Sequence, residues 1–289
     1  MKIRILSWNV RGANDRDKSK IIKSVIKSRK VDVVCLQDTK IKEMTMGLVR
    51  SLGVGRNLEW RAVNSRGAAS GILVFWTTDW WSWLAWKKEF SQFCASLKIV
   101  WMLYSVGVHW SVWPVCSRDR EDLWEELGSI KGLWSDPWCV GGDFNLVRFL
   151  EEHSRGEGLT ASMRRFSEVV EDLELRDFPL MGGPFTWRGG LNNQAQSRLD
   201  RFLVTDKWDS LFNGAVQGIL PKPVSDHFPV LLEEGGLKRG PSPYRFENMW
   251  LEEGFKYKMK MWWESLNFIG TSSFILDAKL RALKNILKN

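Results

Sequence analysis

Short apolar runs alternate with polar turns along residues 1–235, a pattern typical of a chain rich in strands. Runs with many β-branched and aromatic residues predict strands at 2–7, 31–36, 72–76, 100–108, 138–140, 197–204 and 229–232. Apolar positions at helical spacing predict helices at 18–28, 118–133 and 162–173. Many strands follow one another across short turns, which favours mixed sheets with hairpins over a purely parallel sheet. We therefore expect an α/β fold in which a two-layer β-sandwich is flanked by helices, a four-layer sandwich.

A cluster of glycine and proline residues at 235–243 divides the sequence. Beyond it, apolar positions at helical spacing predict helices at 248–267 and 273–289. Two short helices cannot bury such an apolar stripe by themselves. We expect one domain over residues 1–235 and a basic helical tail over residues 236–289, belonging to a larger architecture.

The net charge of the chain indicates a class of binding partner. The 289 residues include 42 Lys and Arg against 34 Asp and Glu, a formal net charge of +8 at pH 7. The tail holds ten of the cations and five of the acids, so it contributes +5 and leaves +3 for residues 1–235. An excess of basic residues favours a polyanionic partner. It does not distinguish between DNA, RNA and phosphoinositides.

The apolar runs are too short to cross a membrane. The most apolar stretch, at 71–86, contains Asp79 and is followed by Lys87 and Lys88. The N-terminus lacks the apolar segment of a secretory signal, and the four cysteines stand at wide spacings with no CxxC pair, as expected of reduced core thiols. We expect an intracellular protein, nuclear or cytoplasmic, with no membrane partner.

Carboxylates and amides recur where the predicted strands end, which is where a sheet displays a functional site. The residues concerned are Asn9, Asp38, Asp143, Asn145, Asp200, Ser225, Asp226 and His227. Such a set suits a phosphodiester substrate, because Mg²⁺ prefers oxygen ligands, which Asp38 and the nearby Asn9 could supply. Asp143 and His227 suit the activation of a water and the stabilisation of developing charge. Asp200 could fix the tautomer of His227 and keep it protonated.

These residues lie in motifs that resemble those of the endonuclease/exonuclease/phosphatase superfamily, the fold of DNase I and of abasic-site endonucleases. The matching motifs, in the family's order, are Trp8-Asn9-Val10, Leu36-Gln37-Asp38-Thr39, Gly142-Asp143-Phe144-Asn145, Ser197-Arg198-Leu199-Asp200-Arg201 and Ser225-Asp226-His227. Within the superfamily the chain most closely resembles the endonuclease domain of plant LINE-type non-LTR retrotransposons. That narrower match rests on Arg120-Glu121-Asp122-Leu123-Trp124, Pro184-Phe185-Thr186-Trp187 and Arg245-Phe246-Glu247-Asn248-Met249-Trp250.

The resemblance implies a metal site and a set of catalytic residues. Asp38 stands where the family has its metal-binding Glu, and Asn9 and Asp226 would complete a site for Mg²⁺, with Mn²⁺ as an alternative. The implied catalytic residues are Asp143, which would orient or deprotonate the attacking water, Asn145 beside it, His227, which would contact the scissile phosphate, and Asp200, which would orient His227.

The resemblance also implies positions that bind the substrate. Ser225 and Thr186 match positions that line the family's phosphate-binding surface. The family carries a Tyr-Gly-Pro after a strand that ends in Gly-Val, whereas Gly107-Val108 is followed here by His109. His109 is therefore the candidate substitute for the missing tyrosine.

The hypothesis that follows is a Mg²⁺-dependent DNA endonuclease that nicks one strand, providing a 3′-hydroxyl primer for reverse transcription. We expect a monomer, with a reverse-transcriptase domain C-terminal to the tail. Two alternatives stay open. Asp38, the missing tyrosine and the tryptophan-rich stretch at 76–113 favour an inactive remnant that binds nucleic acid through its tail, and a phosphatase acting on inositol phosphates or lipids would use the same chemistry.

Overall fold

The computed structural model describes residues 3–55, 57–65, 71–77, 83–87, 94–101, 104–112, 117–133, 136–155, 158–190, 194–212, 214–233 and 254–268, together with several positions between 275 and 286. The chain divides into two compact units, Met1–Lys238 and Arg239–Asn289. Among the helices within these ranges, none is long and apolar enough to cross a membrane.

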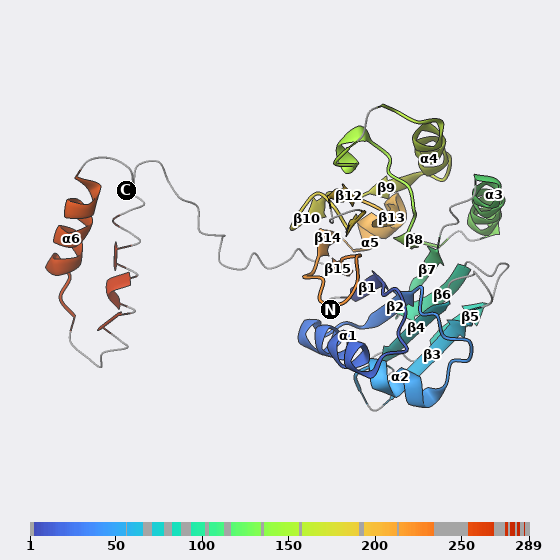
Figure 1. The fold of residues 1–289 in the computed structure, drawn as a ribbon, viewed down its shortest axis with the longest axis horizontal. Coiled ribbons are helices and arrows are strands. Elements are labelled where there is room, and N and C mark those ends of the chain that lie inside the picture. Colours follow the sequence, from blue (N-terminus) through green and yellow to red (C-terminus); the bar gives the residue numbers. More distant parts are fainter. Residues whose placement is uncertain are drawn as a thin grey trace. The chain divides into compact units, whose positions relative to one another are not determined.

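The first unit is built on two mixed sheets (Figure 1). The seven-stranded sheet has the order β10 (Leu180–Met181), β14 (Val216–Ile219), β15 (Val230–Glu233), β1 (Arg4–Asn9), β2 (Val33–Gln37), β4 (Ile72–Thr77) and β3 (Leu58–Val63). The six-stranded sheet has the order β5 (Trp83–Lys87), β6 (Cys94–Trp101), β7 (Tyr104–Val112), β8 (Trp138–Asp143), β13 (Asp200–Thr205) and β9 (Leu175–Asp177). Strands β11 (Trp187–Gly189) and β12 (Ala195–Ser197) form a separate antiparallel pair.

Helices cover the outer faces of both sheets (Figure 1). On the seven-stranded sheet, α1 (Arg16–Arg29) and α2 (Met46–Leu52) bury residues such as Ile22 and Val49. On the six-stranded sheet, α3 (Ser117–Leu133) and α4 (Ala161–Asp172) do the same with Leu127 and Phe166. Among the described residues of the first unit, the remaining helical elements are the short α5 (Asp206–Leu211) and the 3₁₀ turn Leu150–Glu152. The order helices, sheet, sheet, helices confirms the predicted α/β sandwich.

The alternation of side chains along each strand decides which residues face the layer between the sheets. In β1, Ile5 lies in this inter-sheet core, whereas Leu6 and Trp8 pack beneath α1 and α2. Since side chains two residues apart point to the same side, Asn9 at the end of β1 faces the inter-sheet layer. The same reasoning applies to Gln37, Asp143 and Asp200, whose strands place Cys35, Cys139 and Phe202 in that core.

Two predicted strands are wrong in their extent. The strand predicted at 100–108 is a hairpin, in which β6 ends at Trp101 and β7 begins at Tyr104. The strand predicted at 197–204 is two strands, because β12 ends at Ser197 and β13 begins at Asp200. The second break places Asp200 at the beginning of β13 rather than in the middle of a strand. Asp200 therefore lies at the end of the sheet where strands begin and terminate, although β13 itself is an inner strand.

The cysteines fit the predicted reduced core thiols as far as they are described. Cys35 and Cys139 are buried and form no disulfide, and burial raises the pKa of both thiols. The side chain of Cys94 and all of Cys116 lie outside the described residues.

The second unit contains α6 (Phe255–Ser265) and several helical positions between 275 and 286. The ammonium group of Lys279 donates a hydrogen bond to the carbonyl oxygen of Trp263 at 3.1 Å and lies 5.2 Å from the centre of its ring. Of the helix predicted at 248–267, residues 248–253 lie outside the described residues.

Candidate active site

Polar groups from the ends of three strands, β1, β2 and β8, meet at Asp143. The side-chain amide of Asn9 donates a hydrogen bond to Oδ2 of Asp143 at 2.9 Å, across the layer between the two sheets. The backbone N–H of Asn145 donates to Oδ1 at 3.0 Å. In turn, the backbone N–H of Asp143 donates to the side-chain oxygen of Gln37 at 3.0 Å. The position of the Asp143 carboxylate is therefore fixed from both sheets.

His227 lies between two buried carboxylates. Its Nδ1 is 2.8 Å from Oδ2 of Asp200, and its Nε2 is 3.8 Å from Oδ2 of Asp143. All three residues are 1% exposed. Burial lowers the pKa of His227, but the charges of Asp200 and Asp143 and the hydrogen bond to Asp200 raise it more, to about 9. At neutral pH the ring is therefore an imidazolium that donates from Nδ1 to Asp200.

Asp200 has its own shifted ionisation. Burial raises the pKa of Asp200 to about 6, although the charge of His227 acts to lower it. Thr186 holds the backbone at this point, because its Oγ1 accepts hydrogen bonds from the N–H groups of Leu199 at 2.9 Å and Asp200 at 2.8 Å. Thr186 is 0% exposed. It was expected to line a phosphate-binding surface, but the structure places it behind Asp200 as a support.

The backbone of His227 is held by residues of the same motif and of β1. The indole N–H of Trp8 donates to the carbonyl oxygen of His227 at 3.2 Å. The N–H of His227 donates to Oγ of Ser225 at 3.2 Å, and that hydroxyl donates to the carbonyl oxygen of Asn9 at 2.7 Å. Ser225 therefore ties the loop carrying His227 to the end of β1.

Two further carboxylates, Asp38 and Asp226, are less buried and are accompanied by cations. The Asp38 carboxylate is 14% exposed and lies 3.9 Å from the ammonium of Lys40. Oδ2 of Asp226 accepts a hydrogen bond from the indole of Trp187 at 3.0 Å and lies 3.2 Å from the guanidinium of Arg11. Burial acts to raise the pKa of Asp226, but the Trp187 hydrogen bond and the charges of His227 and Arg11 lower it by more. The net effect is a pKa below the usual value.

The backbone at these positions adopts left-handed conformations that side chains rarely accept. Among the described non-glycine residues, six have positive φ, and four of these belong to the site: Arg11 (49°), Asp38 (51°), Lys40 (55°) and Asn145 (49°). Such strain persists only where surrounding bonds over-determine the backbone. Here the loops after β1 and β2 are joined by main-chain hydrogen bonds, from Gly12 to Asp38 at 2.6 Å and from Ala13 to Thr39 at 2.9 Å.

The donor set decides where a divalent cation fits. Ligand atoms of Asp143, Asp200 and His227 all lie within 4.8 Å of one another. A metal bound by this trio would have to displace the proton of Nε2 of His227, whereas without a metal the trio is a carboxylate pair around an imidazolium. Asp38 and Asp226 offer carboxylate oxygens, which hard cations prefer. Burial lowers the pKa of Lys18, whereas the negative charges of Asp226 and Asp38 act to raise it. Both carboxylates therefore lie close enough to Lys18 to act on the same ammonium group.

A buried network of charges connects the loop after β8 to the start of β13. Arg201, which is 0% exposed, binds Glu152 with both terminal nitrogens, at 3.0 and 2.8 Å, and Asp177 at 2.8 Å. Arg198 also pairs with Glu152 and Asp177, at 3.2 and 2.6 Å. Both arginines flank Asp200 in the sequence, so the network anchors the segment that carries it.

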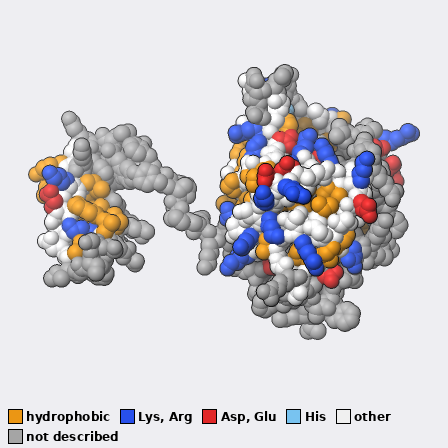
Figure 2. Space-filling view, turned by 60° about the horizontal axis from the view of Figure 1, so that its bottom comes forward, with side chains coloured by type: hydrophobic (Ala, Val, Ile, Leu, Met, Phe, Trp, Pro, Cys, Tyr) orange, Lys and Arg blue, Asp and Glu red, His pale blue; other side chains and the backbone are white. Residues whose placement is uncertain are grey.

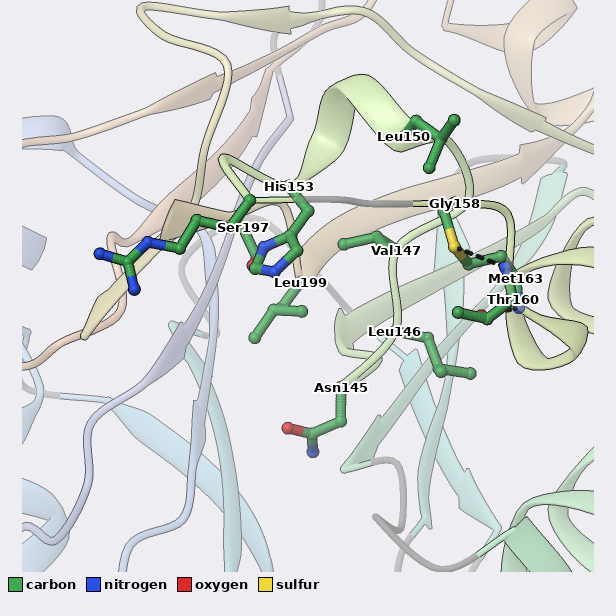
Figure 3. A pocket seen from close by; sticks show the side chains of 11 residues that line it. Asn145, Leu146, Val147, Leu150, His153, Gly158, Thr160, Met163, Ser197 and Leu199 are labelled. Carbon is green, nitrogen blue, oxygen red and sulfur yellow. Dashed lines mark hydrogen bonds between the residues drawn. The ribbon is translucent and has the colours of Figure 1, made fainter. Parts of the chain in front are cut away.

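An apolar cavity of about 390 Å³ lies next to Asn145 (Figure 3). Its lining includes Leu146, Val147, Leu150, Met163 and Leu199. At its edge, Nδ1 of His153 lies 2.7 Å from Oγ of Ser197. The cavity borders the site through Asn145, which lines it and binds Asp143.

The structure thus brings together most of the predicted site residues, whereas Asp38 is linked to the loop after β1 through its backbone, and His109 faces away from the cluster. Asn9, Asp143, Asn145, Asp200, Ser225, Asp226 and His227 are joined by the contacts above. His109 is 0% exposed in β7, with its ring 6.2 Å from that of Trp138, and burial lowers its pKa to about 4. Strand alternation directs the side chain of His109 to the face of β7 opposite that of Val108 and Trp110, which lie in the inter-sheet core.

Comparisons with known proteins identify the family and the fold of the chain. The family model described as "Endonuclease/Exonuclease/phosphatase family" matches residues 6–227. No curated protein matches the sequence. The endonuclease domain of TRAS1, a telomere-specific non-LTR retrotransposon, superposes with a TM-score of 0.61 at 13% identity, covering 81% of this chain and 98% of that one.

Two solved AP endonucleases are similar in the same way. The enzyme LMAP from Leishmania major has a TM-score of 0.65 at 15% identity, with 81% of this chain and 87% of that one covered. The enzyme from Archaeoglobus fulgidus has a TM-score of 0.61 at 14% identity, with 81% and 100% covered. At these identities the similarity establishes the fold.

Proposed function

The chain belongs to the endonuclease/exonuclease/phosphatase family, and on that premise we propose that it is a metal-dependent DNA endonuclease that nicks one strand. The observation that carries the proposal is the imidazolium of His227 held by Asp200 beside the separately anchored carboxylate of Asp143. An acid and a base side by side are what phosphodiester hydrolysis requires. The similarity to the TRAS1 endonuclease domain supports an origin in a non-LTR retrotransposon, and the sequence motifs favour the plant LINE type.

Asp143 is the base in this proposal. Donors from Asn9 and from the backbone of Asn145 fix the orientation of its carboxylate. A water bound to this carboxylate would give up its proton to it as the water oxygen attacks phosphorus. The P–O3′ bond then breaks, and the leaving O3′ takes a proton from a solvent water, which leaves a 3′-hydroxyl and a 5′-phosphate.

His227 stabilises the charge that develops on the phosphate. The 3.8 Å between its Nε2 and Asp143 exceeds hydrogen-bond distance, so the Nε2–H remains available to a phosphate oxygen. Asp200 keeps the imidazole protonated and oriented through Nδ1. A charged donor aimed at developing negative charge in a buried site is among the strongest sources of transition-state stabilisation.

Asp38 and Asp226, with Asn9 nearby, are the residues that would hold a divalent cation. Bound there, Mg²⁺ or Mn²⁺ would supply Lewis-acid stabilisation of the phosphate. Arg11 and Lys40 already neutralise part of the acidic charge at this place.

The full chain is expected to convert supercoiled plasmid to the open circular form in the presence of Mg²⁺, with little linear product, and EDTA is expected to abolish the conversion. The products are separated on agarose gels. The Asp122→Asn variant, which removes an exposed carboxylate on α3, is the control that should nick like the wild type. A folded wild-type protein that leaves the plasmid supercoiled would overturn the endonuclease function and leave the two alternatives, the inactive remnant and the phosphatase.

Mg²⁺ is also expected to raise the melting temperature, independently of activity. A ligand at 100 times its Kd stabilises the folded state by about 2.7 kcal/mol, which corresponds to a shift of several degrees for a domain of this size. The Asp38→Asn variant is expected to lose most of the shift, and Asp122→Asn to keep it, in thermal melts with and without Mg²⁺. An equal shift in all three proteins would place the metal elsewhere.

A further inference from the structure

Arg198 and Leu199 join β12 to β13 and lead directly into Asp200. The backbone of Arg198 is bound on both sides by one buried ion pair. Its N–H donates to the carbonyl oxygen of Glu152 at 2.8 Å, and its carbonyl oxygen accepts a hydrogen bond from the guanidinium of Arg201 at 2.8 Å. Glu152 and Arg201 therefore restrain the backbone two residues before Asp200, as well as binding each other.

Glu152 also restrains the loop that begins after Asp143. One oxygen of its carboxylate, Oε2, accepts a hydrogen bond from the N–H of Arg148 at 2.6 Å, within this loop. The loop is joined to the connection between β12 and β13 a second time, because the N–H of Phe144 donates to the carbonyl oxygen of Leu199 at 2.9 Å. The segments next to both catalytic carboxylates are therefore bound to each other through Glu152.

Asp143 and Asp200 are directly opposite each other in the antiparallel pair of β8 and β13. Like charges at such positions repel each other, and His227 lies between them. The separation of the two carboxylates therefore depends on how firmly the two strand ends are held. Arg201 lies on the other face of β13, the one that carries Leu203 beneath α3 and α4, so it holds the strand ends without occupying the site.

Burial distinguishes Arg201 from the cations at the surface. On the face shown in Figure 2, Lys and Arg side chains stand at the surface, as is usual for them. The side chain of Arg201 is 0% exposed and that of Glu152 is 8% exposed. The guanidinium meets both oxygens of the Glu152 carboxylate, at 3.0 and 2.8 Å, and lies 5.5 Å from the ring centre of Phe166. Such a two-point contact fixes orientation as well as distance, which the single ammonium of a lysine cannot do.

We propose that Glu152 and Arg201 are positioning residues for the reaction, which hold Asp143 and Asp200 at the separation at which His227 fits between them. The inference rests on the endonuclease function above, in which Asp143 is the base and Asp200 orients His227. The pair acts on the chemistry through these two carboxylates and not by touching the substrate. A pair that served stability alone would leave the geometry of the site unchanged when it is replaced.

The test removes the ion pair from the full chain without changing the net charge. Replacing a buried ion pair by uncharged side chains of similar size often leaves stability nearly unchanged, so Glu152→Gln/Arg201→Met should melt close to the wild type. Its kcat for plasmid nicking should fall on the order of 100-fold, the cost of a misplacement of about 1 Å, with little change in KM. Arg201→Lys, which keeps the charge but not the two-point contact, should lie between the two. Glu121→Gln/Arg165→Met removes an exposed pair between α3 and α4, 3.1 Å apart, and should keep the wild-type kcat.

Proton NMR follows the site without any reaction. The chain has three histidines, so the low-field signal of the Nδ1–H that His227 donates to Asp200, at 2.8 Å, can be assigned by its loss in His227→Gln. This signal should persist in the wild type and in the exposed-pair control, and weaken or move upfield in Glu152→Gln/Arg201→Met.

The two measurements separate this inference from the proposed function. A wild-type kcat or an unmoved signal in the double variant would overturn the positioning role. If the double variant does not fold, Arg201→Lys decides in its place by the same two measurements. Wild-type protein that leaves the plasmid supercoiled would overturn the endonuclease function, whereas a displaced signal in the variant would still support the positioning of Asp200 against His227.

Discussion

Replacing Asp143 by asparagine is expected to lower kcat for plasmid nicking by about 10²–10⁴-fold, the range attributed to a general acid or base. Asparagine has almost the same shape but only one acceptor oxygen, so it keeps the hydrogen bond from either Asn9 or the N–H of Asn145, which bind different oxygens of Asp143. It cannot accept a proton from water at neutral pH. The loss should therefore appear in kcat, with a smaller change in KM, when initial rates are measured over a range of plasmid concentrations.

Two controls separate a chemical loss from a structural one. The Asp122→Asn variant makes the same substitution at an exposed position on α3 and should retain wild-type kcat. The melting temperature of Asp143→Asn should stay close to that of the wild type, since burying a neutral amide costs less than burying a carboxylate. Wild-type kcat in Asp143→Asn would remove Asp143 from the chemistry.

The positions of the central site residues could be predicted because they lie at or near strand ends. Asn9, Asp143 and Asp200 stand at strand boundaries, and a period of two residues places them on the same side as Ile5, Cys139 and Phe202 of the inter-sheet core. The pattern could not show that β1 and β8 come from different sheets. The hydrogen bond from Asn9 to Asp143 crosses that layer, and only the packing of the two sheets brings it about.

The supporting residues were harder to predict, because they act through backbone groups. Gln37 accepts the N–H of Asp143, and Thr186 accepts the N–H of Asp200. Neither role is visible in the sequence. Every residue except proline has a backbone N–H, so the sequence does not show which of these groups is bound by a given side chain. The interpretation of Thr186 as a substrate contact was drawn from a motif that specifies the position but not the direction of its hydroxyl.

Short elements and buried charges were missed for related reasons. Strands of two to four residues, such as β10 and β14, are too short to display a period. Residues 100–104 contain no glycine, proline or other turn former, so the hairpin between β6 and β7 was read as one strand. Arginine is usually exposed, so its residue type predicts a surface position for Arg201. Its guanidinium is buried instead, because it forms hydrogen bonds with the carboxylates of Glu152 and Asp177.

The second large effect is expected from the pair of Asp200 and His227. Activity that needs the imidazolium should decline as the pH rises through about 9, the pKa of His227. Asp200→Asn removes the charge that contributes most to raising this pKa, so the alkaline limb of the log kcat/KM profile should move to lower pH. Activity at neutral pH should fall by about 10²–10⁴-fold, because the imidazole is then neither protonated nor correctly oriented.

The same shift makes stability depend on pH, because the pKa of His227 differs between the folded and unfolded states. The folded-state pKa of His227, about 9, lies above its usual value of 6.5. The stabilisation is therefore fully present below about pH 6.5 and is lost as the pH rises through about 9. Wild-type protein should lose melting temperature between pH 7 and 9.5, and His227→Gln should lose less, because it has no proton to release there. Parallel melting curves for the two proteins, together with an unmoved alkaline limb in Asp200→Asn, would show that the imidazole is not held as a cation.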